Sequence, residues 1–349
     1  MFKVKNLIIL INIFFILFFI LLVIELFFNF ILDYRNIVKK STCERIYNNK
    51  KDFSFYSPDC EIIVKHWEQK NFVSYRINSH GRRDLSIKNL NLKKIAFVGD
   101  SFTFGAMVPI EDNYNYYAFN NILKNSFDIH NYGTPSEQLH NVFNKIKNIN
   151  HKNYDYFVYG LTPNDFFNLV DGSYKNSLKN SDNDKKTLEV KKNKMELFKK
   201  IKNYLISTAT SRFISHKLMS NDKIYLQTYL LRAPYSGYLS QNLPSGWNNA
   251  IDYFDKFLID LKPNYKSKLK IFIIPQRAEV VSTRLNTYNF TFVNKIINVC
   301  KKNKIDCFAP NLNPLSNIKE SHFPVDGHLT ILGNHVLAKE LSKWASNWN

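Results

Sequence analysis

The chain has 349 residues, of which 45% are hydrophobic, and this composition is that of a folded protein with a large core rather than of a disordered chain. Its formal net charge is +19, but the lysines are scattered along the whole sequence, without an arginine-rich arm or a nucleic-acid motif. We therefore expect no nucleic-acid partner. A positive surface of this kind can attract anionic lipid headgroups or an acidic glycan.

The first predicted element is an apolar helix over residues 7–32, after a short tail of residues 1–6. Its polar exceptions are Asn12, Glu25 and Asn29. At this length a helix can cross a hydrocarbon core of about 30 Å. The segment has no small-residue cleavage site, so we expect an uncleaved transmembrane anchor rather than a signal peptide. Basic residues flank both of its ends, so the charge pattern leaves the orientation open.

Residues 33–74 form a post-membrane segment ahead of the main domain. This segment contains Cys43 and Cys60, whereas Cys300 and Cys307 flank a turn near the C-terminus. Two local disulfides are one interpretation and four free thiols are the other, and three pairings exist in principle. No Cys-x-x-Cys spacing occurs, which argues against a zinc site.

From residue 75 onward, apolar runs of strand length alternate with amphipathic helical segments. The expected strands cover residues 95–98, 127–131, 156–160, 269–274 and 305–309. The expected helices cover residues 112–125, 136–150, 247–261, 292–303 and 331–348. Such alternation predicts an α/β fold, in which helices cover both faces of a parallel sheet.

The alternation is interrupted over residues 171–246, which we interpret as an insertion. Its first part, residues 171–194, is polar and predicts a loop or linker. Residues 195–219 have apolar residues at helical spacing. They predict a helix packed on the domain, a lid over the site or a helix on the membrane surface. Tyr235, Tyr238 and Trp247 follow, and one interpretation places them in a sugar-binding cleft.

The sequence Gly-Asp-Ser-Phe-Thr-Phe-Gly at residues 99–105 follows directly after the first expected strand of the main domain. A strand that stops at such a turn and continues as a helix presents the hydroxyl of Ser101 at the carboxyl edge of the sheet. The N–H groups of the new helix point the same way and stabilise negative charge there. This position suits a nucleophile in acyl transfer, and the alternative is an ordinary helix-capping serine.

Three further segments supply what a serine nucleophile lacks. Gly133 and Asn164 follow the second and third expected strands, and Asp326 and His328 precede the last helix. His328 can act as the general base for Ser101, and Asp326 can accept from its Nδ1–H and fix the tautomer. An oxyanion could bind the N–H groups of Ser101 and Gly133 and the amide of Asn164. Losing one such donor typically costs about 2.7–4 kcal/mol.

Together these residues resemble the four blocks of the SGNH hydrolases, the GDSL-type esterases and acyltransferases. The resemblance runs from about Tyr75 to the C-terminus, and residues 76–83 look like the segment that precedes the nucleophile in many bacterial members. It implies a catalytic triad and an oxyanion hole. The triad would be Ser101, His328 and Asp326, and the oxyanion hole Ser101, Gly133 and Asn164. One departure is Thr162, which stands where the third block usually has glycine.

The resemblance also implies a three-layer α/β/α sandwich with a five-stranded, flavodoxin-like parallel sheet, and no metal or organic cofactor. We therefore expect a membrane-anchored serine esterase or O-acetyltransferase, with its domain at residues 75–349 in the periplasm or outside the cell. The expected substrate is an acylated small molecule or cell-surface glycan. The alternative is a catalytically inactive SGNH-like module that binds polysaccharide or scaffolds an envelope complex.

Overall fold

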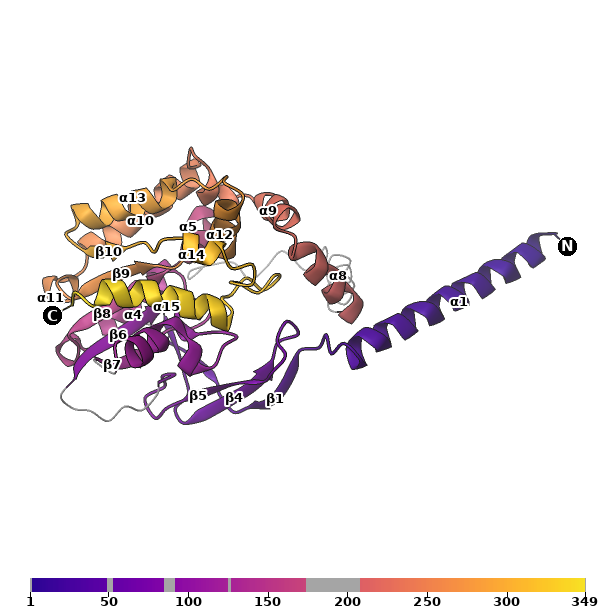
Figure 1. Ribbon diagram of the computed structural model, residues 1–349, viewed down its shortest axis with the longest axis horizontal. Coiled ribbons are helices and arrows are strands. Elements are labelled where there is room, and N and C mark those ends of the chain that lie inside the picture. The colour runs from indigo at the N-terminus through magenta and orange to yellow at the C-terminus, as the bar shows by residue number, and fades with distance from the viewer. Residues whose placement is uncertain (1, 49–52, 85–91, 125–126, 174–207, 349) are drawn as a thin grey trace, which may run out of the picture.

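The structure is a computed structural model that describes residues 2–48, 53–84, 92–124, 127–173 and 208–348. Its N-terminal helix, α1 (Phe2–Phe30), extends away from a body of strands and helices (Figure 1). Within α1, the stretch Ile11–Phe30 has a mean hydropathy of 2.9 and is long and apolar enough to cross a membrane. The helix is therefore compatible with the single-pass anchor predicted over residues 7–32.

The body is built on one sheet of five parallel strands. These are β6 (Lys93–Gly99), β7 (Phe127–Asn131), β8 (Tyr156–Leu161), β9 (Leu269–Ile273) and β10 (Asp306–Phe308). The predicted strands are confirmed, each to within two residues at either end. The order across the sheet is β10-β9-β8-β6-β7, with every neighbouring pair parallel. The chain thus runs from β6 out to β7 and then crosses to β8 on the other side, which creates a topological switch point at β6.

Helices cover both faces of this sheet and complete the predicted three-layer α/β/α sandwich (Figure 1). On one face lie α4 (Leu139–Asn148), α10 (Ser245–Ile259) and α13 (Thr291–Lys302); on the other lie α3 (Tyr114–Tyr116), η2 (Tyr117–Ile122) and α15 (Ile331–Ala345). Along β6, Ala96 and Val98 pack in the first layer, whereas Ile95 and Phe97 pack in the second. The alternation follows from the two-residue period of a strand.

Shorter helices connect these layers. They are α2 (Ser101–Phe104), η1 (Ile110–Asp112), η3 (His151–Asn153), η4 (Pro163–Phe166), α5 (Phe167–Val170), α11 (Pro263–Lys266), α12 (Arg277–Arg284) and α14 (Asn313–Ser316). The sequence did not predict α12. Its buried residues include Arg277 and Glu279, so no continuous apolar stripe marks the helix.

The insertion is described only in part. The predicted linker beyond residue 173 and the helix expected over residues 195–219, as far as residue 207, lie outside the described residues. The remainder forms α8 (Ala209–Met219), α9 (Asp222–Leu230) and η5 (Tyr235–Leu239). Tyr238 and Trp247 are 0% exposed, so the interpretation that they line a sugar-binding cleft is wrong. Their large apolar rings belong to the core, and the indole N–H of Trp247 is satisfied by the carbonyl of Pro234.

The post-membrane segment contains two small antiparallel sheets that the sequence did not predict. One has the order β1-β4-β5, from β1 (Ile37–Ser41), β4 (Cys60–Lys65) and β5 (Val73–Ile77); the other pairs β2 (Arg45–Asn48) with β3 (Phe53–Tyr56). The boundary expected at residues 74–75 falls inside β5. Both local disulfides, Cys43–Cys60 and Cys300–Cys307, are formed. The interpretation as four free thiols is therefore wrong.

The domain end of α1 packs on α8. The carboxylate of Glu25 accepts hydrogen bonds from the N–H groups of Ala209, at 2.6 Å, and Thr210, at 3.0 Å. Phe28 stacks on Phe213 with ring centroids 4.5 Å apart. The N–H groups of a first helical turn favour a negative charge, so this acidic residue of the apolar helix has a partner in the insertion.

Candidate active site

The nucleophile position is set by the short helix α2, which starts immediately after β6. Asp100 caps the helix, because its Oδ1 accepts from the N–H of Phe102 at 2.9 Å. Gly105 ends it four residues later in the left-handed conformation, with a φ of 81°, which glycine adopts without a steric cost. Ser101 is therefore held at the carboxyl end of β6, which is the edge where open α/β sheets bind ligands at their switch point.

The structure brings Ser101, His328 and Asp326 together in one hydrogen-bonded chain. Ser101 Oγ lies 2.7 Å from Nε2 of His328, although the two residues are 227 positions apart in the sequence. Nδ1 of the same ring is hydrogen-bonded to Oδ1 of Asp326. The ring of Phe102 packs against the imidazole with centroids 4.9 Å apart. With the Nδ1 proton held by the carboxylate, Nε2 is the atom that can accept the serine proton.

The electrostatics of this pair follow from burial and mutual contact. Burial alone would lower the pKa of His328, but its hydrogen bond to Asp326 and the charge of that carboxylate outweigh burial and raise the pKa above 6.5. For Asp326 burial would raise the pKa, whereas the hydrogen bond to His328 and the charge on that ring hold it below 3.8. The carboxylate is therefore ionised, and the base is strengthened by its partner.

Asn164, the third-block residue, lies beside the cap of α2. Its Nδ2 donates to Oδ2 of Asp100 at 3.1 Å. A primary amide has two N–H groups, so one of them remains for an oxyanion. Thr162, which replaces the expected glycine, has extended backbone with a φ of −118° and caps η4 together with Asp165. Because any residue adopts this conformation, the path to Asn164 does not require a glycine.

Gly133 lies directly against α2, where only glycine fits. A Cβ at this position would come within 2.3 Å of the backbone nitrogen of Phe104. The N–H of Gly133 donates to Oδ1 of Asn131 at 2.9 Å, within its own turn. To bind an oxyanion, this N–H would have to give up its hydrogen bond to Asn131, so the oxyanion role of Gly133 stays a prediction.

Two contacts at the site were not predicted from the sequence. Asp100 accepts hydrogen bonds from both α2 and Asn164. Its position inside the Gly-Asp-Ser motif is the sequence feature that could have indicated this role. Arg277 donates to the carbonyl of Pro324, on the loop that carries Asp326, and to the carbonyl of Met219 at 2.5 Å. No sequence motif marks Arg277, because its partners are far away along the chain.

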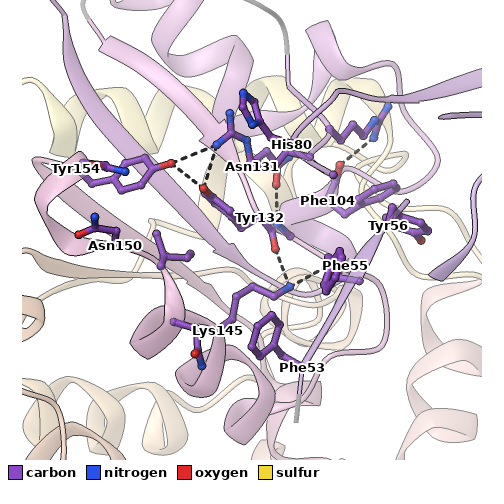
Figure 2. A pocket seen from close by; sticks show the side chains of 18 residues that line it. Phe53, Phe55, Tyr56, His80, Phe104, Asn131, Tyr132, Lys145, Asn150 and Tyr154 are labelled. Carbon is purple, nitrogen blue, oxygen red and sulfur yellow. Dashed lines mark hydrogen bonds between the residues drawn. The ribbon is translucent and has the colours of Figure 1, made fainter. Parts of the chain in front are cut away.

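A cavity of about 310 Å³ lies beside the site, at the carboxyl end of the edge strand β7 and the residues that follow it (Figure 2). Aromatic side chains line it, among them Phe53, Phe55 and Tyr132. Two basic side chains in its wall, Arg82 and Lys145, donate hydrogen bonds to Tyr132. Arg82 Nη1 donates to the hydroxyl of Tyr132 at 3.0 Å, and Lys145 Nζ donates to the carbonyl of the same residue at 2.9 Å. Gly133 connects the cavity to the neighbourhood of α2, whereas the reacting atoms of the Ser101 chain are not in its wall.

No family model and no curated protein matches this chain. A solved member of the lipolytic protein G-D-S-L family from Veillonella parvula is similar at 11% identity and a TM-score of 0.39, covering 73% of this chain and 99% of that one. LAE5, an alpha/beta hydrolase enzyme from the metagenome of Lake Arreo in Spain, is similar at 10% identity and a TM-score of 0.35, covering 74% of this chain and 96% of that one.

Both TM-scores are low, so the fold assignment rests on the sheet order and connections of this chain itself. The protein has the parallel five-stranded sheet, the covering helices and the serine at the switch point that the resemblance to the SGNH hydrolases implies.

Proposed function

We propose that the protein is a serine-dependent acyl-ester hydrolase or O-acyltransferase that forms an acyl-enzyme on Ser101. The observation that carries the proposal is the hydrogen-bonded chain from Ser101 through His328 to Asp326, at the switch point of the sheet. An ordinary capping serine needs no such partners. A nucleophile and its oriented general base need this arrangement.

The proposed reaction uses three side chains, of Ser101, His328 and Asn164, and one backbone N–H group. Ser101 Oγ attacks the ester carbonyl carbon as His328 Nε2 takes its proton. The oxyanion that forms is stabilised by the N–H of Ser101 and by the free N–H of Asn164. His328 then gives the proton to the departing alcohol oxygen, which leaves the acyl-enzyme. In the second half, water or the hydroxyl of a sugar attacks this ester as His328 Nε2 takes its proton. His328 then gives that proton to Ser101 Oγ as the bond to the acyl group breaks, which releases the acid or the new ester.

We propose that this chemistry takes place outside the cytoplasm, on an acylated cell-surface glycan or small molecule, with acetyl as the acyl group. The apolar helix α1 supports a membrane location. The two disulfides support an oxidising compartment, because cytosolic thiols are kept reduced. The choice between water and a sugar hydroxyl decides whether the protein is a hydrolase or a transferase.

The test is labelling of the full-length protein in detergent with a fluorophosphonate probe, which reacts with activated serines. We expect labelling of the wild type and none of Ser101→Ala or His328→Ala. Asn164→Ala should slow labelling by about 100- to 1000-fold, the usual effect of losing one oxyanion donor. Ser240→Ala removes an exposed serine outside the site and should label like the wild type.

A folded wild type that is not labelled would contradict the proposal and favour the inactive, polysaccharide-binding module. After positive labelling, p-nitrophenyl acetate with and without added glycan separates the two reactions. Free acetate in both conditions identifies a hydrolase. Acetylated glycan, detected by mass spectrometry, identifies a transferase.

A further inference from the structure

The loop between β4 and β5, residues 66–72, leaves the post-membrane sheet and contacts the loop that carries Asp326. Glu68 makes this contact. Its Oε1 accepts from the N–H of Val325 at 2.9 Å, and its Oε2 accepts from the N–H of Asp326 at 2.8 Å. The side chain of Glu68 is 0% exposed. A buried carboxylate from outside the expected catalytic domain is thus bonded to the backbone of the candidate triad.

Two such bonds constrain the catalytic loop more than one would. Both oxygens of Glu68 are used, on the N–H groups of two successive residues, so the carboxylate fixes the direction of the peptide unit between them. Bonds from an ionised acceptor to N–H are shorter and stronger than neutral ones. The Cα of Asp326 belongs to this peptide unit. The position of this Cα is therefore fixed, and with it the position from which the Asp326 carboxylate binds Nδ1 of His328.

Glu68 is itself held in place by the loop. The N–H of His66 donates to Oε1 of Gln69 at 3.0 Å, and the N–H of Gln69 donates back to the carbonyl of His66 at 2.8 Å. The side-chain amide of Gln69 also donates to the carbonyl of Met107, just beyond the helix that begins with Ser101. The loop therefore bridges the nucleophile segment and the Asp326 segment.

Trp67 connects the same loop to the residues that follow α1. The N–H of Trp67 donates to Oδ1 of Asn36 at 2.9 Å, and its indole packs against Tyr34 with centroids 5.8 Å apart. Two imidazoles also face Glu68: Nδ1 of His216, on α8, lies 3.5 Å from its carboxylate, and Nδ1 of His66 lies 4.0 Å away. Direct contacts therefore connect the residues that follow α1, through Trp67 and Glu68, to Asp326.

We propose that Glu68 is a positioning residue of the active site, and that the post-membrane loop is a structural part of the catalytic machinery. The inference rests on the proposed function of Ser101, His328 and Asp326. Glu68 acts through the backbone of Asp326. It aligns that carboxylate with His328 and couples the alignment to the position of the anchor.

The experiment uses the full-length protein in detergent and compares Glu68→Gln and Glu68→Ala with the wild type. Gln keeps the size of the side chain but replaces one acceptor oxygen by an NH₂ group, which cannot accept from a backbone N–H. Ala removes both acceptors. The matched control is Glu61→Gln on β4, a carboxylate of the same sheet that accepts from Lys40, Ser74 and Arg76.

We expect fluorophosphonate labelling of Ser101 to slow by between about tenfold and about a hundredfold in Glu68→Gln, the effect of a small misplacement of a catalytic group, and further in Glu68→Ala. The control should label at the wild-type rate. Labelling requires neutral His328, whose pKa the contact with Asp326 raises. A loosened contact lowers that pKa, so the acid limb of the pH–rate profile should shift to lower pH in both Glu68 variants.

A second readout does not depend on turnover. The imidazole of His328 is titrated by NMR in histidine-labelled protein, with its signal assigned by its absence in His328→Ala. We expect its pKa to fall in Glu68→Gln and to remain unchanged in Glu61→Gln. An unchanged pKa and labelling rate in Glu68→Gln, with or without a lower Tm, would overturn the positioning role. An unlabelled wild type in which the pKa of His328 still depends on Glu68 would overturn the esterase function alone.

Discussion

Two buried carboxyl groups, Asp100 and Asp165, lie beside Thr162 near the site, and burial raises the pKa of both. Burial raises the pKa of Asp100, but three donors surround that residue: the N–H of Phe102, Nδ2 of Asn164 and the hydroxyl of Thr162. Burial and the neighbouring charge of Asp100 raise the pKa of Asp165 well above 3.8. The three donors stabilise the charged form of Asp100, whose Oδ2 accepts from the amide of Asn164 and so orients it.

Glu279 allows a test of buried charge that is independent of the reaction. Its carboxylate accepts from the hydroxyl of Tyr288 at 2.6 Å and from the N–H of Gln276 at 2.8 Å. Burial raises its pKa from 4.5 to about 7. The folded state therefore holds a proton that the unfolded state loses first, and stability falls as pH rises through this range, by up to about 3 kcal/mol. Glu279→Gln has no proton to lose, so its loss of stability over this range should be smaller.

The measurement is denaturant unfolding of both proteins at several pH values, read as the difference between them. The difference is needed because burial lowers the pKa of His130 to about 4 and of His322 to about 3, which makes stability rise with pH. Both proteins share these histidines, so their effect cancels. A difference that does not change with pH would show that Glu279 has an ordinary pKa in the folded protein.

At the scale of elements, prediction from the sequence succeeded where burial alone decides the structure. β8 starts at the predicted residue, Tyr156, and ends one residue after the predicted end, because a strand buried on both faces is a nearly continuous apolar run. The turns that carry Ser101 and Asn164 are local, so their residues are recognisable in order. The antiparallel strands β4 and β5 are mixed in polarity and depend on pairing. Glu68 meets Asp326 across 258 positions, and no local pattern encodes such a contact.

The disulfide Cys43–Cys60 joins the connection between β1 and β2 to the first residue of β4, the strand that leads into the Glu68 loop. It closes a loop of 17 residues, whereas Cys300–Cys307 closes one of 7. By chain entropy the first should contribute about 3 kcal/mol and the second somewhat less. We expect the double variant Cys43→Ser/Cys60→Ser to lose more unfolding free energy than Cys300→Ser/Cys307→Ser. Denaturant titration of both under non-reducing conditions measures this, and the reverse order would contradict the loop-length argument.

At the scale of the whole molecule, the N-terminal helix α1 packs on the domain instead of being connected to it only through the chain. Glu25 of α1 caps α8, and α8 ends at Met219, whose carbonyl accepts from Arg277. The guanidinium of Arg277 also holds Pro324, one residue before the pair that Glu68 binds. Two routes of contacts thus connect α1 to the loop that carries Asp326. Under the proposed function, the side of the membrane on which this loop lies decides which esters the protein can reach.

We predict that α1 spans the membrane with its N-terminus inside and that the domain lies outside the cytoplasm. Alkaline carbonate should leave the protein in the membrane fraction, because an apolar stretch such as Ile11–Phe30 is held by hydrocarbon rather than by charge. Protease added to intact spheroplasts should digest the domain and spare an N-terminal tag.

The cysteines give a second readout, because the disulfides persist only outside the reducing cytosol. Maleimide added during lysis should modify none of the four. A protected domain with reactive thiols would place the site in the cytoplasm and contradict a cell-surface substrate, whatever the reactivity of Ser101.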